Sequence, residues 1–188
     1  MISYSNWSVL TASFLVVLYL ALGGVTLSAV LHLVGAQWRY EVRRLAVSLF
    51  ALFPLAFILL LVLLVGGENT FPWLSTATEH GHHLPAWHNY TFLVARQVLG
   101  MLAVMTIFWV FIKRQEVSDR SKEDQQRFHN IANWIPYTFV LYGTMIAWDF
   151  EMTLVPSWHS AIYGMQHFIS NFNMFMAFLV TWIYALNT

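Results

Sequence analysis

The sequence contains no cysteine, and this absence excludes several kinds of site. Without a thiol the chain cannot form a disulfide, a thiolate zinc site, an iron–sulfur ligand set or a cysteine nucleophile. Charged residues are also scarce, at 10% of the chain against about 25% in a typical soluble domain. Much of the surface is therefore expected to face something other than water. The formal net charge of zero gives no indication of a nucleic-acid partner.

Apolar and aromatic residues take the place of the missing charges. Hydrophobic residues make up 59% of the chain and aromatic residues 17%, and tryptophan and tyrosine gather at both interfaces of a membrane. A helix needs about 20 apolar residues to cross the hydrocarbon. The segments of this length cover approximately residues 7–34, 45–65, 90–112, 131–149 and 160–186. The sequence therefore predicts one all-α integral membrane domain, a bundle of about five transmembrane helices.

The distribution of lysine and arginine predicts how this bundle is oriented. The first connection between segments contains three of these cations, and the third connection contains five. They are Arg39, Arg43, Arg44, Lys113, Arg114, Arg120, Lys122 and Arg127. Cytoplasmic loops are enriched in such residues, so both connections are expected on the cytoplasmic side. The N-terminus is then outside, the C-terminus is inside, and residues 66–89 and 151–158 face outside.

The remaining cation, Arg96, lies within the third segment. A charge inside the membrane is costly unless the side chain reaches the interface or finds a partner. Asp149 and Glu151 lie at a similar depth, at the outer end of the fourth segment. Two interpretations stay open: Arg96 extends to the outer interface by itself, or it pairs with one of these acids.

The fifth segment carries a polar stripe at helical spacing. Its members are His159, Tyr163, Gln166, Ser170 and Asn173, with His167 and Asn171 beside them. Polar groups in hydrocarbon need hydrogen-bond partners, so the stripe should face the bundle or another subunit. It either holds helices together or forms part of a proton path or a quinone-head site.

The first two segments differ in how they are expected to pack. The second is apolar on all sides apart from Ser48 and Pro54, so it should face lipid extensively. In the first, Gly24 and Ser28 form a pair of small residues one turn apart. Such a pair allows another helix to approach closely.

Two groups of histidines are weak candidates for metal or haem binding. The external connection contains His80, His82, His83 and His88, and imidazole suits zinc or copper, although such a loop can also simply be solvated. His32 and His129 both lie near the cytoplasmic side, and two facing imidazoles could ligate a haem iron. No catalytic triad or glycine-rich phosphate loop is found.

The passage AWDFEMTLVPSWHSAIYG, residues 147–164, has the most specific pattern in the chain. It resembles the signature of NrfD/polysulfide-reductase-type membrane subunits, above all the larger, ActF-type subunit of bacterial alternative complex III. The matching residues are Asp149, Met152, Leu154, Pro156, Trp158, Ser160, Ile162, Tyr163 and Gly164. Departures from the pattern are Phe150, Val155, Ser157 and His159.

Other motifs agree with that family in their order. They are AQW at 36–38 followed by Arg43 and Arg44, FPW at 71–73, and NYTFLVAR at 89–96. Members of the family carry a second half with further helices, so the resemblance is to the N-terminal half. It implies a membrane subunit of a quinol-oxidising respiratory electron-transfer complex in the bacterial inner membrane.

The resemblance also implies partners and a set of site residues. The partners would be an iron–sulfur protein, a multihaem cytochrome c, a second NrfD-like subunit and lipids. The chain alone would bind no cofactor, and quinone would lie at a subunit interface. The expected proton-path or quinone residues are Arg96, Asp149, Glu151, His159, Tyr163, Gln166, His167 and Ser170. The alternatives are a purely structural or assembly subunit, or a b-type cytochrome subunit.

Overall fold

The computed structural model describes residues 4–74, 87–155, 158 and 160–186, and within these ranges the chain is all-helical. The elements are α1 (Tyr4–Leu33), α2 (Arg39–Ser48), the 3-10 turn η1 (Leu49–Leu52), α3 (Phe53–Val65), α4 (Gly67–Thr70), α6 (Tyr90–Val117), α7 (Lys122–Phe150), the 3-10 turn η2 (Met152–Leu154) and α8 (Tyr163–Leu186). Four stretches of the described chain are long and apolar enough to cross a membrane: Asn6–Leu33, Val42–Val65, Tyr90–Val117 and Tyr163–Leu186. The prediction of an all-helical chain is confirmed for the described residues, and the four candidate spans are consistent with a helical membrane protein.

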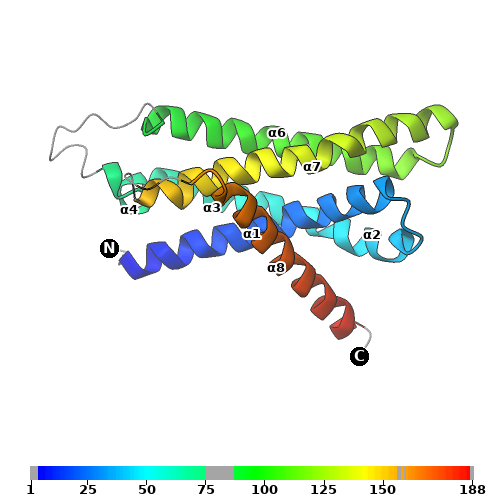
Figure 1. Ribbon diagram of the computed structural model, residues 1–188, viewed down its shortest axis with the longest axis horizontal. Coiled ribbons are helices and arrows are strands. Elements are labelled where there is room, and N and C mark those ends of the chain that lie inside the picture. Colours follow the sequence, from blue (N-terminus) through cyan, green and yellow to red (C-terminus); the bar gives the residue numbers. More distant parts are fainter. Residues whose placement is uncertain (1–3, 75–86, 156–157, 159, 187–188) are drawn as a thin grey trace.

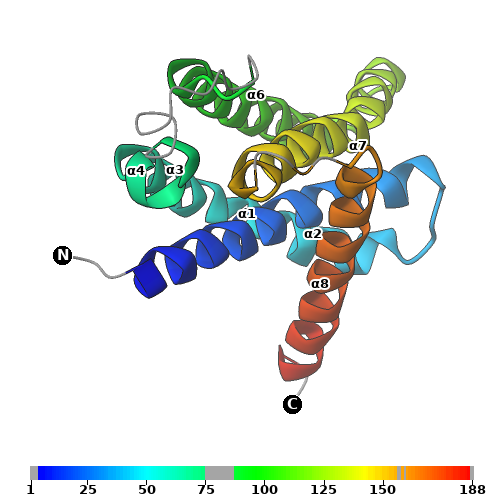
Figure 2. The same ribbon diagram turned by 60° about the vertical axis from the view of Figure 1, so that its left-hand side comes forward.

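Helix α1 lies at the centre of the bundle. It is hydrophobic on all sides, as expected of a helix surrounded by protein, and 78% of its most apolar stretch is buried. Phe14, Leu18 and Leu22 are fully buried. Figures 1 and 2 show α3, α7 and α8 arranged around α1, with α6 packed on α7. The other helices are therefore held together largely through α1 and α7.

The second expected segment, residues 45–65, is longer than predicted and is interrupted. Helix α2 begins at Arg39, and the 3-10 turn η1 separates it from α3. Pro54 stands in the first turn of α3. Proline has no N–H and its ring crowds the carbonyl four residues earlier, which favours a break in the α-helix over the preceding turn. The apolar side chains of Leu55, Ile58 and Val65 are exposed, as expected of a lipid-facing helix.

Helix α7 is longer and more polar than the expected segment 131–149. It begins at Lys122 and runs between α1 and α6 along the bundle (Figure 1). It is not among the four sufficiently apolar stretches, because Asn133, Pro136 and Tyr137 reduce its hydropathy. Its inner face is nevertheless apolar, with Phe139 and Ile146 buried in the core.

The ends of three helices follow from local sequence signals. Gly35 follows α1 with φ of 67°, a left-handed conformation that glycine adopts without strain and that commonly ends a helix. The Asn89 side chain caps α6 by accepting a hydrogen bond from the Phe92 N–H at 3.0 Å. Ser121 caps α7 in the same way through the Asp124 N–H at 3.0 Å. Helix α6 therefore begins where the sequence predicted.

Helix α8 is the least buried of the apolar helices. Only 11% of its most apolar stretch is buried, in contrast to α1. It begins at Tyr163, slightly later than the expected start at 160, and Figures 1 and 2 show it crossing α1 and leaving the bundle at a steep angle. It packs against α7 and α1, and Phe175 and Leu179 in its second half are also buried in the bundle. Its C-terminal end stands clear of the other helices (Figures 1 and 2).

The first testable prediction concerns the contact between α1 and α2. A Cβ added at Gly24 would lie 2.1 Å from the backbone oxygen of Ala46, so Gly24→Ala should destabilise the fold by about 1–3 kcal/mol through overpacking. Circular dichroism during an SDS titration of the micelle-bound protein measures this. The matched control is Gly143→Ala, where the added Cβ would meet the Tyr19 hydroxyl at an ordinary 3.4 Å. Equal losses in both variants would contradict a close contact at Gly24.

Candidate functional site

Two acids predicted as site residues lie at one end of the bundle. At this end α1 and α6 begin and α3 and α7 finish (Figure 1), and we call it the carboxylate end. Asp149 is in the last turn of α7, and Glu151 follows that helix directly. The two side chains belong to separate groups of contacts, which we call the Asp149 cluster and the Glu151 cluster.

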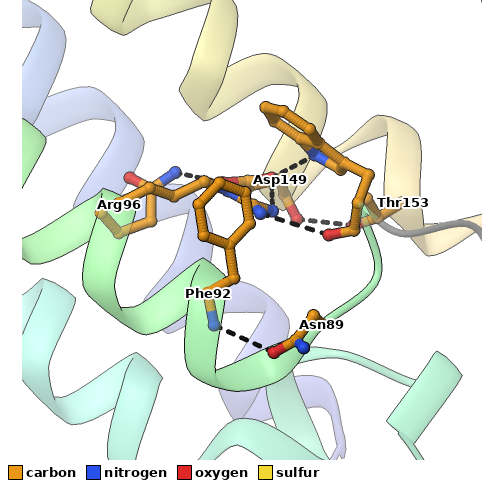
Figure 3. Close-up of polar contacts among 7 residues, drawn as sticks. Asn89, Phe92, Arg96, Asp149 and Thr153 are labelled. Atoms are coloured by element: carbon orange, nitrogen blue, oxygen red, sulfur yellow. Dashed lines mark hydrogen bonds and ion pairs between the residues drawn. The ribbon is translucent and has the colours of Figure 1, made fainter.

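The Asp149 cluster is built around a buried ion pair between α6 and α7. The Arg96 guanidinium donates to both oxygens of the Asp149 carboxylate, with 2.7 Å between Nε and Oδ2 (Figure 3). The Trp87 indole N–H donates to Oδ1 at 2.8 Å, and the Gln97 amide donates to Oδ2. The Arg96 and Asp149 side chains are only 7% and 0% exposed. Arg96 therefore pairs with Asp149 and does not extend alone to an interface.

Further contacts stabilise the buried charges of Arg96 and Asp149. Each oxygen of the Asp149 carboxylate accepts two hydrogen bonds, which fills the positions that an added proton would use. Arg96 also donates to the Trp87 carbonyl at 3.2 Å, and its guanidinium carbon lies 4.1 Å from the centre of the Trp87 ring. Thr153 donates to the Asp149 backbone carbonyl at 2.6 Å and so joins η2 to α7 (Figure 3). A buried pair needs such additional partners to offset its lost hydration.

The Glu151 cluster joins α8 to α1. Glu151 Oε2 accepts a hydrogen bond from the Tyr163 hydroxyl and lies 3.1 Å from His167 Nδ1. The other ring nitrogen of His167, Nε2, lies 2.5 Å from the hydroxyl of the fully buried Tyr19. The Tyr19 hydroxyl can also donate to the Gly143 carbonyl, at 3.3 Å. A continuous chain of polar atoms therefore runs from Glu151 into the core.

This chain can be fully hydrogen-bonded with His167 either neutral or protonated. When His167 is neutral, its Nδ1–H donates to Glu151 and its Nε2 accepts from Tyr19. When the ring is protonated, Nε2–H donates to the Tyr19 oxygen, and the Tyr19 O–H turns to the Gly143 carbonyl. The Glu151 cluster can thus take up a proton without leaving a buried donor or acceptor unpaired.

Glu151 differs from Asp149 in its access to space outside the core. Its side chain is 26% exposed and lines a cleft of about 390 Å³ together with parts of α1, α4 and η2. Burial raises the pKa of Glu151, but hydrogen bonds from His167 and Tyr163 outweigh that effect and hold the pKa below its usual value. The carboxylate form therefore predominates at neutral pH.

The cleft beside Glu151 is mostly apolar and has a few polar groups. Its lining consists of Trp7, Ser8, Thr11, Ala12, Leu15, Asn69, Thr70, Pro72, Phe150, Glu151 and Leu154. Small-molecule sites typically combine an apolar wall of this size with a small number of placed polar groups. The cleft can accommodate an aromatic ring next to the Glu151 carboxylate.

The other predicted proton-path residues do not join these clusters. Gln166 and Ser170 are exposed on α8, whereas His167 is buried against α1. The stripe from Gln166 onward therefore does not face the bundle, whereas Tyr163 near its start and the neighbouring His167 contact Glu151. His159 lies outside the described residues.

The predicted histidine sites are only partly within the described chain. His80, His82 and His83 lie outside it, and the described residues contain no group of three or more metal-ligating side chains. His88 packs against Trp73, with 5.3 Å between ring centres. Burial lowers the pKa of His88, the Arg96 charge lowers it further, and the Asp149 charge opposes this. A neutral His88 beside Arg96 belongs to the surroundings of the Asp149 cluster.

His32 and His129 lie together at the opposite end of the bundle. Their ring centres are 5.6 Å apart in an edge-to-face arrangement, and His32 also packs on Phe128 at 4.3 Å. The sequence placed both near the cytoplasmic side, and the structure brings the two rings together. Haem ligation stays a prediction, and because the rings already touch one another, it would require them to move apart.

Several residues of the two clusters were not identified from the sequence. They are Tyr19, Trp87, Gln97 and Thr153. Tyr19 carries a polar hydroxyl in the middle of the apolar first segment, and Gln97 adjoins the embedded Arg96, so both could have been noticed as polar groups needing partners. Trp87 and Thr153 lie outside the expected helices and gave no periodic signal.

Comparisons with known proteins do not place the chain in a family. No protein-family model matches it, and no curated protein matches it. The resemblance to NrfD-type subunits therefore stays a prediction that rests on the motifs of the sequence, mainly residues 147–164.

The ion pair provides a second testable prediction. Asp149→Leu or Arg96→Met leaves one buried group without its partner, which should cost about 3–5 kcal/mol of unfolding free energy. The double variant Arg96→Met/Asp149→Leu should recover part of that loss, because no buried charge is left unpaired. A double-mutant cycle of SDS-induced unfolding measures the coupling.

The exposed ion pair of Arg127 and Glu123 on α7 is the control for this cycle. Its side chains are 54% and 73% exposed, so Arg127→Met and Glu123→Gln should each cost less than about 1 kcal/mol. The buried pair is not coupled if the variants at Arg96 and Asp149 lose no more unfolding free energy than these controls. The same conclusion follows if the two losses simply add in the double variant.

Proposed function

We propose that the chain is a membrane subunit of a quinol-oxidising respiratory complex of the alternative-complex-III type, in a bacterial inner membrane. The resemblance of residues 147–164 to NrfD-type subunits supports this assignment. In the proposed topology α7 is a fifth span, the N-terminus is outside and the C-terminus is inside. The cations between α6 and α7 then face the cytoplasm, and the carboxylate end faces outside.

The observation that carries the proposal is the position of Glu151 between a cleft and a buried polar chain. On one side its carboxylate lines the apolar cleft of about 390 Å³. On the other it contacts His167, which leads to Tyr19 in the core. An ionised carboxylate at the wall of an aromatic-sized cleft is suited to accept a proton from a hydroxyl of bound quinol.

The proposed reaction divides protons and electrons between this chain and its partners. Oxidation of a quinol to a quinone releases two electrons and two protons. Glu151 takes one of these protons, and the other is released to water outside the cleft. His167 and Tyr19 rearrange their hydrogen bonds to stabilise the new charge distribution. Iron–sulfur and haem centres of the expected partner subunits would accept the two electrons. Arg96 and Asp149 hold α6 and α7 in place and do not themselves exchange protons.

A purely structural role is the second candidate, and the Asp149 cluster favours it. The Asp149 carboxylate accepts four hydrogen bonds, two on each oxygen. The charges of Asp149 and Arg96 are both buried. An arrangement of this kind can brace two helices without any chemistry. On this alternative Glu151 would likewise only connect α7 to α8, and its replacement by glutamine would leave turnover intact.

Replacement of Glu151 tests the proposal in the purified complex. Glu151→Gln should lower the kcat for quinol oxidation by on the order of 10²-fold or more, because the proton acceptor is lost. In the wild type the rate should fall as the pH drops below the ordinary range of a glutamate, because the pKa of Glu151 is lowered and ionised Glu151 is required.

The control is Glu68→Gln, which replaces the exposed acid of α4 in a different cleft of the carboxylate end. It should leave the quinol oxidation rate and its pH profile unchanged. Subunit composition is checked for each variant on native gels. A fully assembled Glu151→Gln complex with normal turnover would remove Glu151 from the mechanism and favour the structural role.

A further inference from the structure

The contact between α6 and α7 contains two buried polar atoms that the ion pair of Arg96 and Asp149 leaves unsatisfied. They are Oε1 of Gln97, on α6, and the hydroxyl oxygen of Tyr142, on α7. The two residues are 0% and 4% exposed, and within the described part of the chain neither atom has a hydrogen-bond partner. Nearly all buried polar atoms in folded proteins have at least one partner. Both atoms therefore indicate a bound group that can form hydrogen bonds.

The orientation of the Gln97 amide follows from its contact with Asp149. An ionised carboxylate only accepts hydrogen bonds, so the Gln97 nitrogen, which donates, must face Asp149 Oδ2. Turning the amide over would bring two acceptors together and lose this contact. Oε1 of Gln97 is therefore left as a buried acceptor that requires a donor from elsewhere.

Tyr142 lies against α6 close to Gln97. A Cβ added at Gly100 would be 3.0 Å from Cε2 of the Tyr142 ring, and Gly100 follows Gln97 by three residues, which is nearly one helical turn. The carboxylate charge of Asp149 also acts on the Tyr142 hydroxyl. The hydroxyl and the Gln97 amide thus both belong to the part of the α6–α7 contact that adjoins the ion pair of Figure 3.

We propose that a water molecule binds between Gln97 and Tyr142. The water donates a hydrogen bond to Oε1 of Gln97 and accepts one from the O–H of Tyr142. Buried waters typically make two to four hydrogen bonds, to polar groups that otherwise have none. An ion is less suited to this site. An anion would be repelled by the Gln97 carbonyl oxygen, and a cation would find both oxygens of Asp149 already occupied by donors.

The proposed water extends the polar contact between the two helices. Gln97 already joins α6 to Asp149 on α7, and the water continues this connection from Gln97 to Tyr142. Tyr142 precedes Asp149 by seven residues, or about two helical turns. The water would therefore join α6 and α7 over a longer stretch than the ion pair does alone. The inference does not depend on the proposed function.

The variant Tyr142→Phe tests the proposal through the direction of its effect on stability. It removes the hydroxyl and keeps the ring. If the hydroxyl binds a water, its removal loses hydrogen bonds, and the equilibrium constant for SDS-induced unfolding of the full chain should rise about 2- to 10-fold. Removal of a buried hydroxyl that has no partner should instead leave the constant unchanged or lower it, and either result would overturn the proposal. The control is Tyr137→Phe, on the same helix at 66% exposure, which should leave the constant unchanged.

A crystal structure at a resolution that shows ordered waters separates a bound water from a direct bond between the two side chains. The wild type should show a density peak within hydrogen-bonding distance of both Gln97 Oε1 and the Tyr142 hydroxyl, and the peak should weaken or disappear in Tyr142→Phe. A wild-type structure in which Tyr142 bonds directly to Gln97, with no peak between them, would overturn the proposal even if Tyr142→Phe is destabilised.

Discussion

The buried ion pair of Arg96 and Asp149 is the interaction on which the carboxylate end of the structure depends. Neither charge could remain in an apolar bundle without the other, and the pair fixes how α6 and α7 meet. From the same residue, the Asp149 backbone carbonyl holds Thr153 and with it the turn η2. Glu151 lies between Asp149 and Thr153 in the chain, and both of these residues are held in place. The ion pair of Asp149 with Arg96 therefore also fixes the position of Glu151, the proposed proton acceptor.

Two carboxylates separated by one residue thus have different surroundings and different proposed roles. Asp149 is saturated with donors and closed off from space outside the core. Glu151 shares its charge with His167 and Tyr163, adjoins a cleft, and connects to Tyr19 through a histidine that can hold either protonation state. The first arrangement provides rigidity, and the second provides a place for a proton. Different surroundings can give two nearby carboxylates different roles.

The sequence predicted the features that depend on the cost of polarity in an apolar environment. The helical segments followed from that cost, and so did the expectation that Arg96 either reaches the interface or pairs with Asp149 or Glu151. The direction of the α8 stripe did not, because periodicity shows which residues share a face and not what the face meets. His167, expected only at the edge of the stripe, is the side chain that turns inward. Tyr19 was missed because its partners are far away in the sequence.

The central claim is that Glu151, and not Asp149, takes up a proton when quinol is oxidised. Infrared difference spectroscopy of the assembled complex on quinol addition tests this through the C=O band of a newly protonated carboxyl group. The account predicts such a band in the wild type and in Glu68→Gln, and its absence in Glu151→Gln. A band that persists in Glu151→Gln and disappears in Asp149→Asn would contradict the account.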